Sequence, residues 1–277
     1  MGEFTWVDAG AIAAIGLMAG TLGGLLGVGG SVIMIPALTA IFGPEQHLYQ
    51  AAAMAVNVGV AVPAAWRHHG AGAARRDVLR AMLPAAVVAV LAGVGLSNLF
   101  QGEAAERWLK RLFALLLAYV VWVNIARLRR EIAGRHHAAS GETPAAAASP
   151  RPAARSASAG VGGVMGLTAG LLGVGGGAIA VPLQQIALRL PLRSCIANSA
   201  IVMVFSAAIG AVMKIATLPG HGVAPRDALL LAALLAPTAI LGGRLGASLT
   251  HRLPLWQVRL AFVALMIAAA LKMAGLG

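Results

Sequence analysis

The sequence predicts an all-α polytopic membrane protein with two inverted-topology repeats, each a glycine-broken helical hairpin followed by three transmembrane helices. Three observations lead to this fold class: an apolar composition, a duplicated glycine motif and the placement of positive charge. Hydrophobic residues make up 59% of the 277 residues and charged residues only 11%, whereas soluble domains carry about 25% charged residues. Long unbroken apolar runs indicate helical spans rather than the alternating strands of a barrel.

The glycine motif occurs once in each half of the chain. Residues 25–36 read LLGVGGSVIMIP and residues 171–182 read LLGVGGGAIAVP, with eight of twelve positions identical. The same offset relates two pairs of upstream glycines, Gly16 with Gly162 and Gly20 with Gly166. Low-complexity Gly/Ala sequence could match itself, but the shared terminal proline argues against that explanation. The chain is therefore predicted to contain an internal duplication.

Each half divides into four apolar segments. They cover residues 8–43, 48–66, 78–100 and 108–126 in the first half, and 159–190, 195–216, 227–250 and 254–274 in the second. Most match one span of about 20 residues. The first segment of each half is too long for one span and contains a glycine cluster, and each glycine weakens a helix by about 1 kcal/mol relative to alanine. We expect two helical pieces there, joined at a glycine turn.

A polar stretch from Arg127 to Ser158 separates the halves. It contains charges, prolines, serines and short alanine runs, a composition typical of a flexible linker. The predicted organisation is a first transmembrane repeat over residues 1–127, a cytoplasmic polar linker over 128–158 and a second transmembrane repeat over 159–277.

The positive-inside rule then sets the topology. With the arginine-rich linker in the cytoplasm, loop 67–77 is also inside, while the N-terminus and residues 43–47, which lack Lys and Arg, are outside. Both ends of the first broken segment then face one side, so it is a hairpin; Arg189 and Arg193 place both ends of the second inside. A hairpin plus three spans inverts the second half, an organisation found in many secondary transporters. This topology leaves six basic residues outside: Arg107, Lys110, Arg111, Lys214, Arg226 and Lys272.

The glycine turns are candidate anion sites. If the second helix of each hairpin begins at Gly30-Ser31 or Gly176-Gly177, its N-terminus carries free N–H groups and partial positive charge inside the membrane. Such a turn must face protein or a water-filled cavity, because lipid cannot satisfy its backbone. The alternative role is helix packing, which we assign to the small-residue steps at Gly16, Gly20, Gly24, Gly242 and Gly246. Neither turn is followed by Lys-Ser/Thr, which excludes a nucleotide-binding P-loop.

Three polar residues inside the spans are candidate ligands. Asn57 lies midway along segment 48–66, and Asn198 and Ser199 lie near the start of segment 195–216. They could line the same cavity as the turns, or each could bond to a neighbouring helix. Gln184 and Gln185 are expected at a membrane boundary.

Ionisable residues are nearly absent from the spans. All nine Asp and Glu residues lie at segment ends or in loops, which disfavours a carboxylate proton relay or cation site, and Asp77 and Asp227 are expected as helix N-caps. Lys214 and Arg244 are expected to reach for the interface. His68, His69 and the single Cys195 provide no metal site, and no cofactor is predicted. An enzyme would need ionisable groups at a reaction centre, and a nucleic-acid partner would need a soluble basic surface, so neither class is expected.

Two copies of G-L-L-G-V-G-G-x-x-I-x-x-P, Gly24–Pro36 and Gly170–Pro182, resemble the signature of the TauE/SafE family of sulfite-exporter-like transporters. The resemblance extends over the two halves, their broken first helices and the polar linker. In that family a short Ala-x-x-Thr-Ser stretch often follows each broken helix; Asn198-Ser199 resembles it, whereas Val56-Asn57 departs from it. The resemblance implies transport of sulfur-containing anions such as sulfite, sulfoacetate and other sulfonates, often outward.

These observations predict a multi-pass carrier in a bacterial inner membrane that moves a small sulfonate or sulfite by alternating access. The expected partners are the anion and the lipid bilayer, and a homo-oligomer is left open. The backbone at six turn residues and three side chains is expected to bind the substrate: Gly29, Gly30, Ser31, Gly175, Gly176 and Gly177, with Asn57, Asn198 and Ser199. A passive anion channel and a non-transporting membrane scaffold remain as alternatives.

Overall fold

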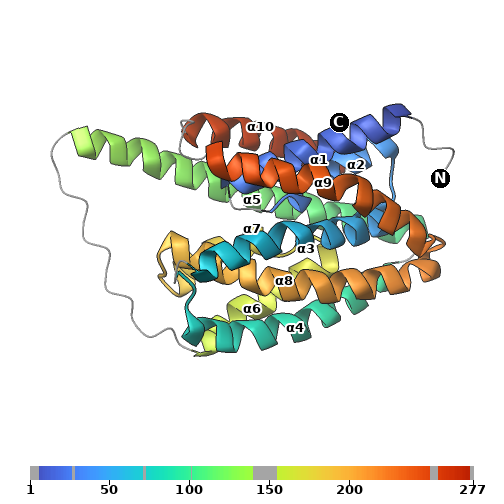
Figure 1. Cartoon of the computed structure of the whole chain (residues 1–277), viewed down its shortest axis with the longest axis horizontal. Helices are drawn as coiled ribbons and strands as arrows, with labels where there is room; N and C mark the ends of the chain where they lie inside the picture. The colour runs from blue at the N-terminus through green and yellow to red at the C-terminus, as the bar shows by residue number, and fades with distance from the viewer. Residues whose placement is uncertain are drawn as a thin grey trace.

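The computed structural model describes residues 6–26, 29–70, 73–100, 102–139, 155–249 and 255–274, and within them the chain is helical (Figure 1). The elements in order are α1 (Trp6–Leu26), α2 (Ser31–Phe42), α3 (Gln46–Gly70), α4 (Arg76–Asn98), α5 (Gly102–Ala139), α6 (Arg155–Leu172), α7 (Gly177–Ala187), α8 (Leu192–Thr217), the 3-10 turn η1 (Leu218–His221), α9 (Pro225–Leu249) and α10 (Leu255–Ala274).

Six of these helices contain stretches long and apolar enough to cross a membrane. The stretches are Trp6–Gly24, Gln46–Trp66, Arg76–Asn98, Arg107–Ala126, Leu192–His221 and Pro225–Gly246. The all-helical membrane fold predicted from composition is thus confirmed. Large apolar side chains cover the outside of the bundle, and exposed tryptophans stand at the beginning of α1 and near the end of α3, the positions at which such rings anchor a protein at the lipid–water interface.

Both long apolar segments break at their glycines, as predicted. In the first half, α2 begins at Ser31, and in the second, α7 begins at Gly177; Gly27 and Val28 lie outside the described residues. A Cβ at Gly30 would lie 3.3 Å from the Ala19 carbonyl oxygen, and one at Gly176 would lie 2.6 Å from that of Met165. Residues eleven apart on a straight helix would be separated by about 16 Å. The chain therefore turns back at each break.

Helices from different halves pack closely in two pairs. In these pairs α1 lies along α9 and α6 lies along α4, while α3 packs against α8 between them (Figure 1). A Cβ on any of six glycines would overlap a backbone carbonyl oxygen of the partner helix: Gly16, Gly20 and Gly24 against α9, and Gly162, Gly166 and Gly170 against α4. The packing role predicted for these glycines in α1, and for Gly242 against α1, is confirmed.

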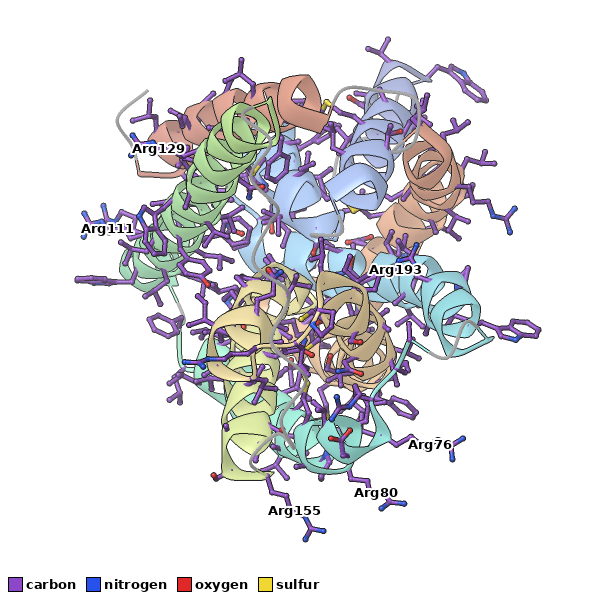
Figure 2. The ribbon with its side chains drawn as sticks, turned by 90° about the vertical axis from the view of Figure 1, so that its left-hand side faces the viewer. Arg76, Arg80, Arg111, Arg129, Arg155 and Arg193 are labelled. Atoms are coloured by element: carbon purple, nitrogen blue, oxygen red, sulfur yellow. The ribbon has the colours of Figure 1, made fainter. Side chains whose placement is uncertain are left out.

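Several arginines lie at one end of the bundle. At the left end of Figure 1, α3 ends and α4, α6 and α8 begin. Figure 2 looks onto this end and shows Arg76, Arg80 and Arg155 projecting outward from the beginnings of α4 and α6, with Arg193 at the beginning of α8. At the opposite end, α3 begins and α4 and α8 end.

Two local expectations differ from the structure. Helix α5 continues through Ala139 and α6 already begins at Arg155, so helix extends into both sides of the segment expected to be linker; residues 140–154 lie outside the described part. The N-cap assignments are wrong as well. Arg75 precedes α4, and Asp77 lies inside its first turn, bonded to the Arg75 guanidinium, while Asp227 lies in the first turn of α9. A carboxylate there still favours the helix by its charge.

Candidate functional site

The two glycine turns converge on one side chain, that of Met203 in α8. A Cβ at Gly175 would lie 2.9 Å from Met203 Sδ, and one at Gly29 would lie 4.0 Å from the same atom. Both glycines have positive φ, +66° at Gly175 and +90° at Gly29, a conformation that L side chains rarely adopt. Since Met203 lies near the middle of α8, the turns meet about midway along the bundle.

Asn57 lies at the same place, near the middle of α3. Its side chain is 1% exposed, and a Cβ at Gly175 would lie 2.8 Å from Asn57 Nδ2. This amide nitrogen has no hydrogen-bond partner. A buried donor without a partner is costly, so its position beside the turn favours ligand binding over bonding to a neighbouring helix. Ser31, in the first turn of α2, likewise has a buried hydroxyl without a partner.

The N-termini of α2 and α7 add backbone donors to this region. Gly30 and Gly176 accept the first bonds of the two helices, from Met34 and Ala180, and Gly176 is left-handed with φ +75°. The first N–H groups of a helix have no acceptor within that helix, and they carry its partial positive charge. The turns therefore present donors rather than acceptors.

Asn198 and Ser199 belong to a different network, centred on Gln184. The Gln184 Nε2 atom donates to Ser199 Oγ at 2.7 Å, and its Oε1 accepts from Asn198 Nδ2 at 3.1 Å. Asn198 Oδ1 accepts from the Arg75 backbone N–H at 2.9 Å. The Gln184 side chain is fully buried, and the boundary role expected for it stays a prediction. The network joins α7 and α8 to the beginning of α4.

The expected site residues thus separate into two groups. The glycine turns and Asn57 lie together around Met203, whereas Asn198 and Ser199 are bonded to Gln184 and to the Arg75 backbone N–H. The two groups are linked through α8, on which Ser199 lies one helical turn before Met203.

Lys214 is a polar residue whose environment the sequence analysis missed. The side chain expected to reach for the interface is 2% exposed, and its Nζ donates to Gln50 Oε1 at 2.6 Å and to Ser97 Oγ at 2.9 Å. The signal was present in α8, where Met203, Ala207, Gly210 and Lys214 follow helical spacing and are all buried. Arg244, in contrast, is exposed.

The chemistry of this interior suits an anion. Amide, ammonium and helix N-terminal donors are gathered in it, and the acidic residues lie at segment ends or in loops. No group of three His, Cys, Asp or Glu side chains that could hold a metal occurs within the described ranges; the side chains of His68 and His69 lie outside them. Cys195 is a buried thiol in the first turn of α8, and its Sγ donates to the Leu190 carbonyl oxygen.

Comparison with protein families gives a match over nearly the whole chain. The model described as "Sulfite exporter TauE/SafE" matches residues 12–273. No solved structure matches significantly.

Three relatives illustrate the similarity to curated proteins. The chain is 29% identical to "Probable membrane transporter protein MamO" of Paramagnetospirillum magneticum over 99% of its own length, and it spans only 45% of that relative. It is 25% identical to a "Probable membrane transporter protein" of Haemophilus influenzae, covering 94% of this chain and 95% of the relative. It is 23% identical to "Probable membrane transporter protein YunE" of Bacillus subtilis, covering 87% of this chain and 88% of the relative.

Proposed function

The chain belongs to the sulfite exporter TauE/SafE family of membrane transporters, and on this basis we propose that it is a secondary transporter of small sulfur-containing anions. Membership of a transporter family separates it from enzymes. The proposed substrate is sulfite or a sulfonate such as sulfoacetate, moved outward across a bacterial inner membrane with the segment between the halves in the cytoplasm.

The observation that carries the proposal is the meeting of both glycine turns at Met203 beside the unpaired amide of Asn57. A sulfonate group or the sulfite dianion presents three oxygens that accept hydrogen bonds and no proton to donate. Backbone N–H groups at the turns Gly29–Ser31 and Gly175–Gly177, with Asn57, provide matching donors midway through the bundle. Asn198 and Ser199 are bonded to Gln184, so we assign them to the adjacent network rather than to the anion site itself.

Alternating access requires two equivalent halves arranged around one site. The packing of α1 on α9 and of α6 on α4 supports inverted repeats, because exchanging the two halves maps one pair onto the other. Each half contributes one turn to the site, so a rocking motion of the pairs would expose it to one side and then to the other. A passive channel would share the site but would not need two equivalent halves that move in turn.

The test is counterflow in proteoliposomes loaded with unlabelled sulfite or sulfoacetate and given the labelled anion outside. A carrier accumulates label transiently by exchange, whereas a channel does not. We expect counterflow by the native chain, at least a tenfold loss in Asn57→Ala, and native rates in Ser158→Ala. The control is matched, because Ser158 is also fully buried and its hydroxyl also lacks a partner.

The outcomes separate the alternatives. Anion flux without counterflow would establish a channel in place of a carrier. Exchange of carboxylates at the same rate as their sulfonate analogues would overturn the substrate class. Equal rates in Asn57→Ala and Ser158→Ala would show that the site lies elsewhere.

A further inference from the structure

We propose that Lys214, Gln50 and Ser97 form a second anion-binding site, toward the end of the bundle where α3 begins and α4 and α8 end. Its ligand is a small oxyanion, which for the proposed function is the same sulfite or sulfonate on its way to or from the glycine turns. Gln50 and Asn57 are seven residues apart on α3, so the two sites are separated by about 10 Å, too far for one small anion to occupy both.

The first argument is charge. Lys214 is buried among α3, α4 and α8, and both of its hydrogen-bond partners are neutral. The titratable groups within electrostatic range are His47 of α3 and His221 of η1, which can only add positive charge, and α4 contributes neutral Ser97. A buried ammonium is stabilised when a counter-charge accompanies it. Since no carboxylate is paired with Lys214 in the described structure, a bound anion would supply that charge.

The second argument is the set of unused donors. An ammonium group has three N–H donors and no acceptor, and two of those of Lys214 are directed at Gln50 and Ser97. Because the ammonium can only donate, the Gln50 oxygen must face it and the amide nitrogen must face away. That Nε2 atom is buried and has no partner. One oxyanion could therefore accept from Gln50 and from the remaining N–H of Lys214.

The third argument is position. A Cβ at Gly173 would lie 2.7 Å from the Cβ of Gln50, and one at Gly175 would lie 2.8 Å from Asn57 Nδ2. The second glycine turn thus packs along one face of α3 and contacts both residues. An anion released from Lys214 and Gln50 could move along this turn and bind next at Asn57. The two sites would then be occupied one after the other during transport.

A pair of stacked histidines lies near the outer side of this second site. The rings of His47 and His221 are 3.7 Å apart and nearly parallel, and His47 Nε2 and His221 Nε2 lie within hydrogen-bond distance of Phe100 O and Asn98 Oδ1. The stack joins the beginning of α3 to η1.

The test is calorimetric titration of the purified full chain with sodium sulfite, sodium sulfate and sodium nitrate. We expect two oxyanions per native chain. In Lys214→Gln the number falls to one, and the anion-induced rise in melting temperature is at least halved, while Lys214→Arg retains both sites. Lys272→Gln is the matched control, since Lys272 is exposed and donates only to the Ala40 carbonyl.

Gln50→Glu provides a second, independent variant. Its carboxylate would form an ion pair with Lys214 and take the place of the bound anion. This variant should therefore fold at least as stably as the native chain and bind one anion. Native stoichiometry in both Lys214→Gln and Gln50→Glu would overturn the second site while leaving the proposed function standing. Two bound oxyanions without counterflow of any sulfur anion would overturn the proposed function while leaving the second site standing.

Discussion

At the scale of the residue, the buried polar side chains fall into two kinds. Gln184 has every polar atom bonded, to Ala180, Cys195, Asn198 and Ser199. The amide nitrogens of Gln50 and Asn57 have none. Fully paired groups specify a unique packing, whereas unpaired donors lower stability, and we assign those of Gln50 and Asn57, which lie beside the second glycine turn, to a ligand. In the proposed function, the same residue chemistry therefore serves structure in one place and binding in the other.

This contrast predicts opposite costs for two similar truncations. Gln184→Ala removes the partner of Asn198 Nδ2 and of Ser199 Oγ and should lower the free energy of unfolding by about 2–4 kcal/mol. Asn57→Ala removes a donor that was already unpaired, so its cost without substrate should stay below about 1 kcal/mol. Unfolding in detergent with increasing denaturant measures both. Similar losses in the two variants would contradict the division.

The sequence located some of these residues and misjudged others for identifiable reasons. Asn57 could be predicted, because a polar residue midway along an apolar span is conspicuous. The hydrogen bonds of Gln184 to Asn198 and Ser199 could not be predicted from the sequence, because they depend on how α7 packs beside α8. Lys214 was misjudged because it lies near the end of its segment, where lysine usually reaches water; the packing of α3 and α4 around it is a tertiary effect.

At the scale of the element, glycines let helices of different halves approach to backbone contact. The α1–α9 and α4–α6 pairs each place three glycines of one helix against carbonyl oxygens of the other. With the backbones this close, van der Waals contact replaces the hydrophobic driving force that lipid cannot supply.

This contact predicts a strong position dependence for a single methyl group. Gly166→Ala would press its Cβ into the Ala86 carbonyl and force α6 from α4, a cost of about 2 kcal/mol or more. Gly95→Ala, on α4 with nothing near its Cβ position, should instead stabilise the helix by up to about 1 kcal/mol. Denaturant unfolding of both variants checks this, and a stable Gly166→Ala protein would contradict it.

Helix positions were largely predictable, and the exception is instructive. The breaks at α2 and α7 follow from glycine clusters within apolar runs, which have a direct conformational cause. The extension of α5 through Ala139 was not predicted, because the polar composition of the segment after residue 127 is typical of a linker. Residues such as Arg127, Arg129, Arg130 and Glu131 are nevertheless good helix formers, so this part of the chain leaves the apolar pattern without leaving the helix.

At the scale of the whole molecule, the fold class followed from composition and the family from the glycine motif. Neither required the structure. The inverted arrangement of the halves is still a prediction, because it rests on counting positive charges and on the exchange symmetry of the helix pairs. Labelling in intact cells shows on which side of the membrane each loop lies.

Equivalent positions in the two halves provide that measurement. Arg76-Asp77 and Arg226-Asp227 begin corresponding helices, α4 and α9, and both arginines are exposed. In a Cys195→Ala background, a membrane-impermeant maleimide added to intact cells should label Arg226→Cys and leave Arg76→Cys unlabelled. Labelling both or neither would place the two loops on one side and exclude inverted repeats.

The crossed packing of the helix pairs has a consequence for how the protein can be divided. The first helix of each half packs along a helix of the other half, α1 on α9 and α6 on α4. We therefore expect these contacts, and not the connection between Ala139 and Arg155, to hold the halves together. Two separately translated polypeptides ending and beginning within that stretch should assemble into a working complex when made in the same cell. Either fragment made alone would expose a seam of glycines and backbone carbonyls to lipid, and it should be degraded. The two halves would then behave as two different subunits that depend on each other to fold and are encoded as one chain.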